Sequence, residues 1–320
     1  MAVFEMLYAT DEDKAMVLVE EGGRMQRFEV APGIQLSFNE LATDSCYRAL
    51  EVGQEFLELD YCMSGCYEVV LDDGSVIFLG EGDLAVSNLG PGRRLFSGSR
   101  LPTGRYRGIT VLVALEKAQQ GLNADFPQGD IDLAALRERL CGDGQVMIVQ
   151  EKQRLAHILG ELADAGEERR APYFWLKVME LLLFLSLVDG AGVKRPQHFS
   201  AETSQRTRAV YEYLTQEPFT MLTIPELAVR FGIGESSLKR CFKSLTGVSL
   251  GAFMKRKRIE AAAALLVAEP LLAVGEVGAR AGYENQSKFS AAFKAVMGTT
   301  PHAYRRSRCS EWSKNWPLRS

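Results

Sequence analysis

Between residues 28 and 115, short apolar runs alternate with turn residues, a pattern typical of β-strands. Asp72-Asp73-Gly74, between two of these runs, is a strong hairpin signal. Many short strands at this spacing predict a small antiparallel barrel. The strand-like runs are residues 56–61, 67–71, 76–79, 84–86 and 107–114.

After about residue 130 the apolar spacing becomes helical, over residues 131–140, 151–165 and 172–188. In the last segment apolar residues cover most of the helix surface. That helix is therefore buried on more than one face, either within the monomer or at a dimer contact. Residues 189–204 are rich in Gly, Pro and Ser and predict a linker.

An internal repeat follows the linker, with copies that begin at Thr223 and Val274. Each copy has one helical apolar pattern, then a glycine suited to the left-handed conformation, then a second helical pattern. Small residues, Ala228 and Gly278, stand where the two helices of each copy would cross. This order predicts two helix-turn-helix units.

Local signals fix the ends of these helices. Thr223 to Glu226 predicts a capping box, and Asn285 predicts an N-cap. Residues 251–268 predict one continuous helix of ~27 Å, at ~1.5 Å per residue. Such a spacer could hold two recognition helices in successive major grooves, ~34 Å apart. Two interpretations of the basic run 255–258 stay open, a solvated face and phosphate contacts, because four consecutive residues point all around a helix.

The net charge of −4 alone makes nucleic acid an unexpected partner, but the charge is unevenly placed. Residues 200–320 hold 18 Lys+Arg and 10 Asp+Glu, a net charge of +8, whereas residues 1–199 have a net charge of −12. The basic part points to DNA. The first residues do not resemble a signal peptide, and the most apolar run, 173–188, is shorter than the ~20 residues of a membrane span. We therefore expect a cytoplasmic protein with reduced thiols and no membrane partner.

The last hundred or so residues resemble the AraC/XylS family of transcription regulators. The matching positions in the first unit are Leu227-Ala228, Phe242-Lys243 and Gly247, and those in the second are Gly282-Tyr283, Phe289, Phe293-Lys294, Gly298, Pro301 and Tyr304-Arg305. The resemblance implies a DNA-binding domain with two helix-turn-helix units, and RNA polymerase as a further partner. Two departures stand out: Gly278 should loosen its helix, and Ala291 replaces an often basic position, so the last recognition helix should read fewer bases.

Exposed positions at the start of each recognition helix should face base edges, where Arg and Lys suit guanine and Asn and Gln suit adenine. For Arg240, pairing with Glu235 or with a phosphate stays open. The base-contact candidates are Glu235, Ser236, Lys239, Arg240, Asn285, Gln286, Ser287 and Lys288, and the phosphate-contact candidates are Lys243, Lys294 and Arg305.

The same resemblance implies that the acidic front half is a cupin-like barrel that binds an effector or dimerises. Residues 28–115 are similar to the front domain of pyochelin-type, siderophore-responsive regulators, which implies a ferric siderophore as effector. Arginine suits anionic groups, although pairing with the domain's own carboxylates is the alternative. The effector-binding candidates are Arg93, Arg94, Arg100, Arg105, Tyr106 and Arg107.

The sequence gives little support for a metal site or for an enzyme. The three histidines lie outside the strand-rich region, so we expect no metal or other cofactor. Cys62 and Cys66 would share one face of an alternating strand, but without further nearby ligands we expect buried or incidental thiols. This disfavours a DNA-repair alkyl-acceptor protein with an AraC-like module, and no nucleophile–base pair predicts another enzyme.

The sequence as a whole predicts an α+β protein, with a cupin-like barrel and following helices in front of an all-α domain. The expected function is an effector-controlled, sequence-specific DNA-binding regulator that forms a homodimer. A ligand-free activator whose front domain only dimerises is the alternative. The expected parts are residues 1–190 for effector binding and dimerisation, a linker over 191–204, a DNA-binding domain over 205–306, and a tail over 307–320.

Overall fold

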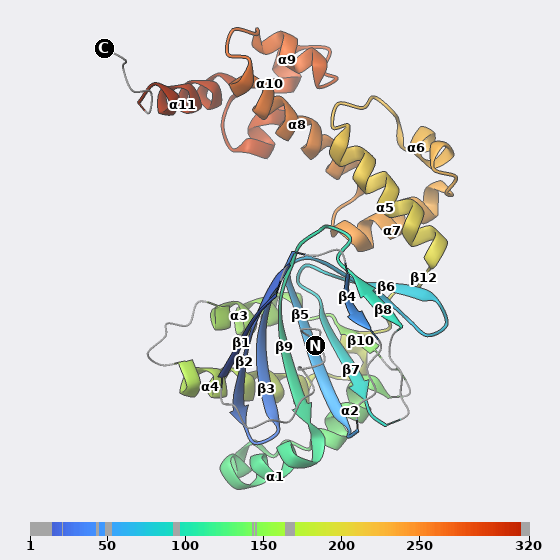
Figure 1. Ribbon diagram of the computed structural model, residues 1–320, viewed down its shortest axis with the longest axis vertical. Coiled ribbons are helices and arrows are strands. Elements are labelled where there is room, and N and C mark those ends of the chain that lie inside the picture. The colour runs from blue at the N-terminus through green and yellow to red at the C-terminus, as the bar shows by residue number, and fades with distance from the viewer. Residues whose placement is uncertain are drawn as a thin grey trace. The chain divides into compact units, whose positions relative to one another are not determined.

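The computed structural model describes residues 15–20, 22–42, 45–48, 53–91, 97–142, 144, 146–163 and 170–314 (Figure 1). The chain divides into two compact units: Met1–Ser204 with Ser244–Gly247, and Gln205–Lys243 with Val248–Ser320. The first unit is rich in strands and the second is helical, so the predicted α+β class is confirmed. None of the described helices is both long and apolar enough to cross a membrane.

The strands of the first unit pair along an open path, β1-β2-β3-β9-β5-β7-β10-β11, with β6, β8, β4 and β12 branching from it. The described strands do not close, and the predicted cupin-like barrel is therefore not confirmed. The strands are β1 (Ala15–Glu20), β2 (Gly23–Ala31), β3 (Ile34–Leu41), β4 (Ser45–Arg48), β5 (Phe56–Val70), β6 (Ser75–Gly80), β7 (Leu84–Leu89), β8 (Gly98–Arg100), β9 (Tyr106–Ala114), β10 (Val146–Val149), β11 (Val193–Lys194) and β12 (Phe199–Ser200).

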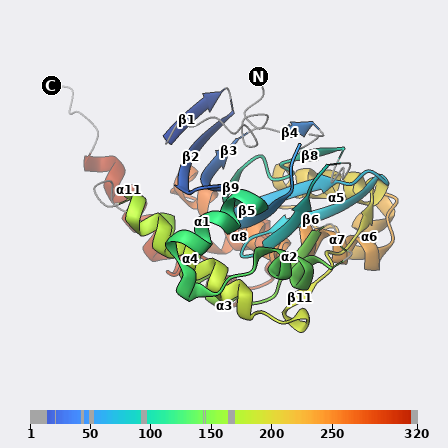
Figure 2. The same cartoon turned by 90° about the horizontal axis from the view of Figure 1, so that it is seen from below.

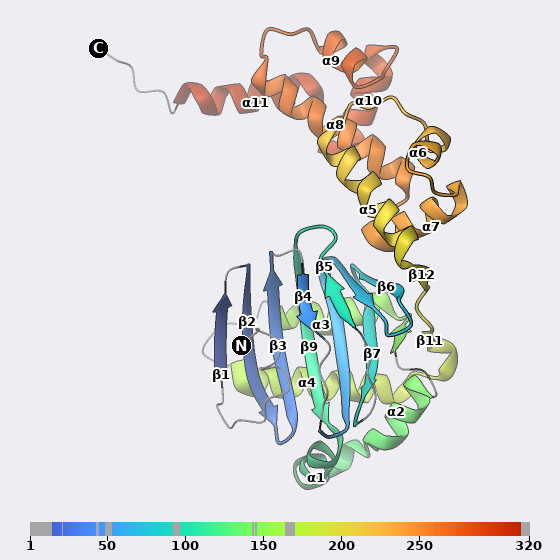
Figure 3. The same ribbon diagram turned by 45° about the vertical axis from the view of Figure 1, so that its right-hand side comes forward.

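Four α-helices follow in the first unit, where α3 and α4 lie against one face of the sheet (Figures 2 and 3). We call this the apolar face, because alternate residues such as Leu36, Leu59 and Val111 are buried there against Phe174 and Leu182 of α4. The predicted helices are confirmed within a few residues. The helices are α1 (Leu115–Asp125), α2 (Leu133–Cys141), α3 (Lys152–Ala163) and α4 (Arg170–Leu187), with short 3-10 turns at Pro127–Gly129 and Gly190–Gly192.

The opposite face of the same sheet carries a band of buried polar residues, and we call it the polar face. Directly opposed residues share a face, and one such row contains Arg27, Ser37, Thr110 and Asp60 on β2, β3, β9 and β5. A neighbouring row contains Glu58 of β5 and Ser87 of β7. All but Asp60 are buried, so this face combines burial with an unusual density of polar groups.

A bulge in β5 changes the sequence-based picture of this strand. The runs 56–61 and 67–71, predicted as two strands, are one 15-residue strand. The register on β9 shifts between Cys62 and Ser64, which reverses the side-chain alternation beyond that point. Cys62 and Cys66 therefore lie on opposite faces, and the expectation of a shared face is wrong. The predicted turn at Asp72-Asp73-Gly74 is confirmed by hydrogen bonds between Leu71 and both Gly74 and Ser75.

The segment predicted as a linker contains β11 and β12. Val193 and Lys194 pair with β10, and Phe199 and Ser200 pair with Val76 and Ser75 of β6. The Ser75 hydroxyl also lies 3.1 Å from Nδ1 of His198. Much of this segment thus belongs to the sheet of the first unit.

The helical unit is organised around α8, which contributes to two separate apolar cores. Leu250, Phe253 and Met254 belong to the first core, with Leu227, Leu238 and Phe242. Ile259, Ala262, Ala263 and Leu266 belong to the second, with Val277, Phe289 and Phe293. At about 3.6 residues per turn the two sets lie on opposite sides of α8. The helices are α5 (Ala201–Gln216), α6 (Ile224–Arg230), α7 (Glu235–Thr246), α8 (Leu250–Ala268), α9 (Val274–Arg280), α10 (Gln286–Met297) and α11 (Pro301–Lys314).

The polar face generates a prediction about pH and stability. Burial raises the pKa of Asp60 from 3.8 to about 6, and the hydrogen bond from Thr110 lowers it by less. A carboxyl group whose pKa is higher in the folded state contributes stability that is lost as the pH rises through the folded value. Asn cannot ionise, so it does not lose this contribution. The free energy of unfolding of Asp60→Asn, relative to that of the wild type, should therefore rise by about 1 kcal/mol as the pH increases from 5 to 8.

Urea unfolding of both proteins at pH 5, 6, 7 and 8 measures this gain. Asp125→Asn, which alters an exposed carboxyl at the end of α1, is the matched control and should show no pH-dependent gain. A difference between Asp60→Asn and the wild type that is constant across these pH values would contradict the prediction.

Candidate nucleic-acid interface

The first helix-turn-helix unit is made by α6 and α7. The predicted capping box is confirmed: the Glu226 carboxylate accepts from the Thr223 backbone N–H at 2.7 Å, and the Thr223 hydroxyl accepts from the Glu226 N–H at 3.4 Å. Gly232 ends the first helix at φ +63°, and Ile233 then donates its N–H to the Ala228 carbonyl at 3.0 Å. The turn places α7 directly against α6 through the buried Leu227 and Leu238.

The second unit, α9 and α10, repeats this construction. Gly282 has φ +83°, and the Asn285 side chain caps α10 by accepting from the Lys288 N–H at 2.8 Å, as predicted. Gly278 was expected to loosen α9, but it also permits a close approach of α9 to Phe289 of α10. A Cβ atom at Gly278 would lie 3.0 Å from the Phe289 ring, so glycine is the residue that fits there.

On α7 the polar residues form one stripe opposite the buried one. Leu238, Cys241, Phe242 and Leu245 are buried against the first core. About 180° away around the helix lie the exposed residues of the polar stripe. The structure therefore brings four of the predicted contact residues of this helix onto a single solvent-facing side: Ser236, Lys239, Arg240 and Lys243. Glu235 is also exposed but lies three residues before the buried Leu238, at the edge of this stripe.

Lys239 of the α7 stripe forms an ion pair with Glu235, one turn earlier in the helix. The predicted alternative for Arg240 was a pair with that same carboxylate. Among the described residues Arg240 has no ion-pair partner, and it is exposed. Arg240 is thus the residue of this stripe whose guanidinium is available for a ligand.

On α10 the corresponding stripe is less charged. Ser287 and Lys294 lie on the side opposite the buried Phe289 and Phe293, together with Ser290 and Ala291. The exposed Gln286 stands three residues before Phe289 and seven before Phe293, so it lies on their side of the helix. Lys288 is exposed but lies about 120° from the centre of this stripe. The Asn285 carbonyl oxygen is already used in the N-cap. The structure therefore brings only part of the predicted second set together.

In each helix-turn-helix unit an arginine of the following helix binds the loop that precedes the unit. Arg258 of α8 donates to the Thr220 carbonyl at 2.9 Å, in the loop before α6. Arg305 of α11 donates to the carbonyls of Pro270 and Leu272, at 3.0 and 2.6 Å, in the loop before α9. In each case the helix that follows a unit holds the loop that precedes it. Arg305, predicted as a phosphate contact, has its guanidinium engaged within the protein.

The rest of the basic run on α8 also has partners. Arg256 and Lys257 lie 3.5 and 3.1 Å from the Glu260 carboxylate, whereas Lys255 is exposed. The sequence did not distinguish these four residues. Their helical positions explain the difference, since Arg258 faces the Thr220 loop and Lys255 faces solvent.

In the first unit, the predicted effector residues that the structure describes point in different directions. Arg107 lies 3.5 Å from Glu40, and Arg100 lies 3.8 Å from Glu68. Tyr106 is buried on the polar face, whereas its exposed neighbours Arg105 and Arg107 point away from it. Arg93 and Arg94 lie outside the described residues. Across the described part of the chain, no group of three or more His, Cys, Asp or Glu side chains is arranged to hold a metal.

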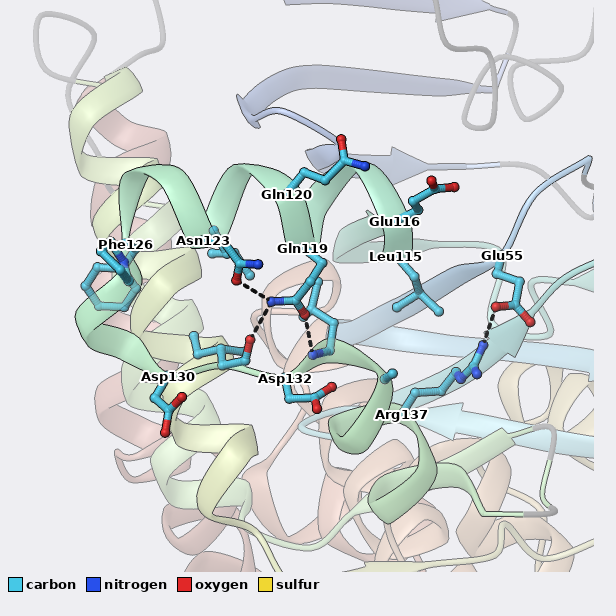
Figure 4. A pocket seen from close by; sticks show the side chains of 15 residues that line it. Glu55, Leu115, Glu116, Gln119, Gln120, Asn123, Phe126, Asp130, Asp132 and Arg137 are labelled. Carbon is cyan, nitrogen blue, oxygen red and sulfur yellow. Dashed lines mark hydrogen bonds and ion pairs between the residues drawn. The ribbon is translucent and has the colours of Figure 1, made fainter.

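A pocket of about 770 Å³ lies between α1 and α2 (Figure 4). The Gln119 amide donates to Asn123 Oδ1 and to the Ile131 carbonyl, both at 2.9 Å, and accepts from the Leu133 N–H. Arg137 pairs with Glu55 at 2.9 Å. These polar groups thus pair with one another, whereas the lining residues Glu116, Gln120 and Asp130 take no part in these contacts.

The geometry of α6 to α11 defines a helix-turn-helix domain, and the comparisons agree. Residues 227–307, about a quarter of the chain, match the family model described as "Helix-turn-helix domain". Transcriptional regulator Rob of Salmonella typhimurium is 35% identical over 94 residues, which cover 29% of this chain and 31% of that protein. The HTH-type transcriptional activator AarP of Providencia stuartii is 30% identical over 84 residues, covering 26% and 62%.

These matched relatives are named as transcription regulators, and the matched residues support a helix-turn-helix domain at the C-terminal end. The chain spans about a third of the length of the first curated relatives it matches. The siderophore-type similarity of the front half is not confirmed. Among solved structures, the DNA-binding domain of AdpA in complex with a target DNA has a TM-score of 0.32 at 23% identity, covering 34% of this chain and 98% of that one. ToxT from Vibrio cholerae has a TM-score of 0.34 at 14% identity, covering 85% and 98%.

The position of Arg305 generates a stability prediction. Arg305→Ala removes a charged donor from two carbonyls and should lower the free energy of unfolding by about 1–3 kcal/mol. Lys294→Ala, an exposed lysine in the same unit, should change it by less than about 0.5 kcal/mol. Chemical unfolding of the full chain measures both. Equal stabilities of the two variants would show that Arg305 does not hold the loop.

Proposed function

We propose that this protein is a sequence-specific DNA-binding transcriptional regulator of the AraC type, controlled by a small effector bound in its first unit. The observation that carries the proposal is the pair of helix-turn-helix units on one helix, each with a solvent-facing polar stripe opposite its buried stripe. The net charge of +8 over residues 200–320 favours a polyanionic partner. The similarity to Rob and AarP supports transcription regulation as the outcome.

The two recognition helices differ in what they present to DNA. The α7 stripe has Arg240 and the paired Lys239 at positions where the α10 stripe has Ala291 and Ser290. A guanidinium that reaches guanine O6 and N7 is the commonest specific contact in a major groove. We therefore assign most base reading to α7 and a larger share of backbone positioning to α10.

Arg240 and Lys294 provide a matched pair of variants. Arg240→Ala should weaken binding to the selected site by ~1–3 kcal/mol and leave binding to random duplex nearly unchanged. Lys294→Ala, a predicted phosphate contact on α10, should weaken both alike and reduce the salt slope by about 1. Fluorescence anisotropy with both duplexes at several salt concentrations measures these quantities. Equal losses on specific and random DNA for Arg240→Ala would remove its base-reading role.

In this proposal the front unit regulates the DNA-binding activity of the helical unit. The resemblance of residues 28–115 makes a ferric siderophore one proposed effector, and a ligand-free front unit that only dimerises is the alternative. Thermal shift of the full chain with ferric pyochelin separates them, because a ligand that binds the folded state raises the melting temperature. We retain residues 1–190 as the effector unit, 205–306 as the DNA-binding unit and RNA polymerase as a further partner.

A homodimer is supported by the outer side of α4. Leu176 and Leu187 are 58% and 82% exposed, and eleven residues apart they lie on the same side of the helix. Two large exposed apolar side chains on one side of a helix favour a protein contact. This matches the dimer alternative for residues 172–188.

The double variant Leu176→Glu/Leu187→Glu should convert a dimer to a monomer, as measured by light scattering after size exclusion. Leu271→Glu, at a fully exposed leucine of the helical unit, is the control and should leave the mass unchanged. A monomeric wild type at tens of micromolar, or a double variant that still forms a dimer, would refute the contact.

A further inference from the structure

The loop that joins α5 to α6, residues 217–223, contacts both apolar cores of the helical unit (Figure 1). The Leu222 side chain packs against the first core, which contains Leu227 of α6. Three residues earlier, the half-buried Phe219 packs against the second core, which contains Phe289 of α10. The loop that precedes the first helix-turn-helix unit therefore reaches into the core of the second.

Hydrogen bonds hold this loop against α5 and α8. The Thr220 carbonyl accepts from Arg258 Nη2 of α8 at 2.9 Å, and the Thr220 hydroxyl lies 3.1 Å from the Tyr213 hydroxyl of α5. The Thr220 backbone N–H donates to the Glu217 carbonyl at 3.0 Å and closes a turn that contains Phe219. The backbone on both sides of Phe219 is thus anchored, so its ring is directed into the second core.

Met221 of the same loop lies over the glycine turn of the second helix-turn-helix unit. A Cβ atom at Gly282 would lie 3.0 Å from the Cε and Sδ atoms of Met221 and 3.7 Å from Arg258 Nη1. Gly282 has φ +83°, so both its backbone and this close approach favour glycine. Met221 is 55% exposed, yet its end rests on this turn. The loop therefore contacts the second helix-turn-helix unit at two places, its core and its turn.

The helix α8, which the structure describes throughout, contributes no residue to both cores. Between Met254 of the first core and Ile259 of the second it has only the four basic residues 255–258. Long helices bend, and compact units that share little apolar contact are expected to move relative to one another. We conclude that α8 sets the mean rotation between the two helix-turn-helix units, and that a second connection is needed to limit bending about it.

We propose that Phe219 and Met221 are positioning residues that hold the two helix-turn-helix units at one relative rotation, and so restrict the half-site separation that the protein accepts in DNA. The inference rests on the proposed DNA-binding function and names the residues that set its spacing. Two recognition helices held rigidly can enter successive major grooves together only when these are about 10–10.5 base pairs apart. One inserted base pair moves the second half-site by about 3.4 Å and rotates it by about 34°. Units joined by α8 alone could follow this change by bending, whereas units also joined by the loop could not.

The test is fluorescence anisotropy of the full chain with three duplexes: the selected site, that site with one base pair inserted between its two contacted grooves, and a site with one groove randomised. For the wild type the insertion should weaken binding by about tenfold, because both units can no longer engage together. For Phe219→Ala/Met221→Ala the insertion should weaken binding by less than about threefold. Affinity for the single-groove site should stay within about twofold of the wild type, because neither residue lies on a recognition helix.

Val296→Ala is the matched control. Val296 is half-buried against the second core, but it belongs to α10 and not to the loop. This variant loses packing in the second core and should keep the wild-type discrimination against the inserted base pair. Phe219→Leu, which preserves an apolar side chain in the loop, should also keep it. A role of Phe219 in stability alone would not change the preferred spacing.

The inference would be overturned by a double variant that still discriminates as the wild type does, or by a Val296→Ala protein that loses discrimination equally. Met221 is exposed, so Met221→Ala should fold and relax the discrimination in part. If the double variant does not fold, unchanged discrimination in Met221→Ala overturns the inference instead. A wild type that selects a sequence but tolerates the insertion removes only this inference, whereas a wild type that selects no sequence removes the proposed regulator.

Discussion

The helical unit depends on one constraint: α8 must bury two apolar stripes on opposite sides of itself. Leu250, Phe253 and Met254 pack into one core, and Ile259, Ala262 and Leu266 pack into the other. Both helix-turn-helix units are therefore attached to a single rod of 19 residues, about 28 Å long. This arrangement fixes how one helix-turn-helix unit is rotated relative to the other about the axis of α8. Insertion or deletion of one residue in α8 would change that rotation by about 100°.

Two arginines connect the first and last segments of each helix-turn-helix unit. Arg258 and Arg305 reach back from the following helix to the loop before the unit, and Gly278 lets α9 approach Phe289. Positions that are basic in sequence thus divide into two physical groups. Some hold the protein together, while Arg240, Lys243 and Lys294 remain exposed at the surface proposed for DNA.

The helical unit was largely predictable from the sequence because its signals are local. Caps at Thr223 and Asn285, turn glycines and the 3.6-residue period all act within a few residues. The front unit depends on non-local pairing. No local signal marks the bulge after Cys62, which joins two predicted strands and separates Cys62 from Cys66. The role of Arg305 was also hidden, since its partners Pro270 and Leu272 lie more than thirty residues away.

In the front unit, alternation such as Leu57-Glu58-Leu59-Asp60 did indicate a strand, but the usual interpretation places the polar side in solvent. Here the polar side is also largely inaccessible to solvent, because Glu58 is buried and Asp60 is half-buried. The short strand β12 is joined to this sheet, since Phe199 pairs with Val76 of β6 and its ring lies 5.8 Å from that of Phe78.

The measurement that tests the account most directly is selection and sequencing of the DNA bound by the purified full chain, followed by hydroxyl-radical footprinting of the selected site. Two units on one α8 predict two contacted major grooves on one side of the duplex, about 10 base pairs apart. The stronger sequence preference should lie in the groove that loses it in Arg240→Ala. Selection of a single groove, or of no sequence at all, would contradict the claim that both units act together on DNA.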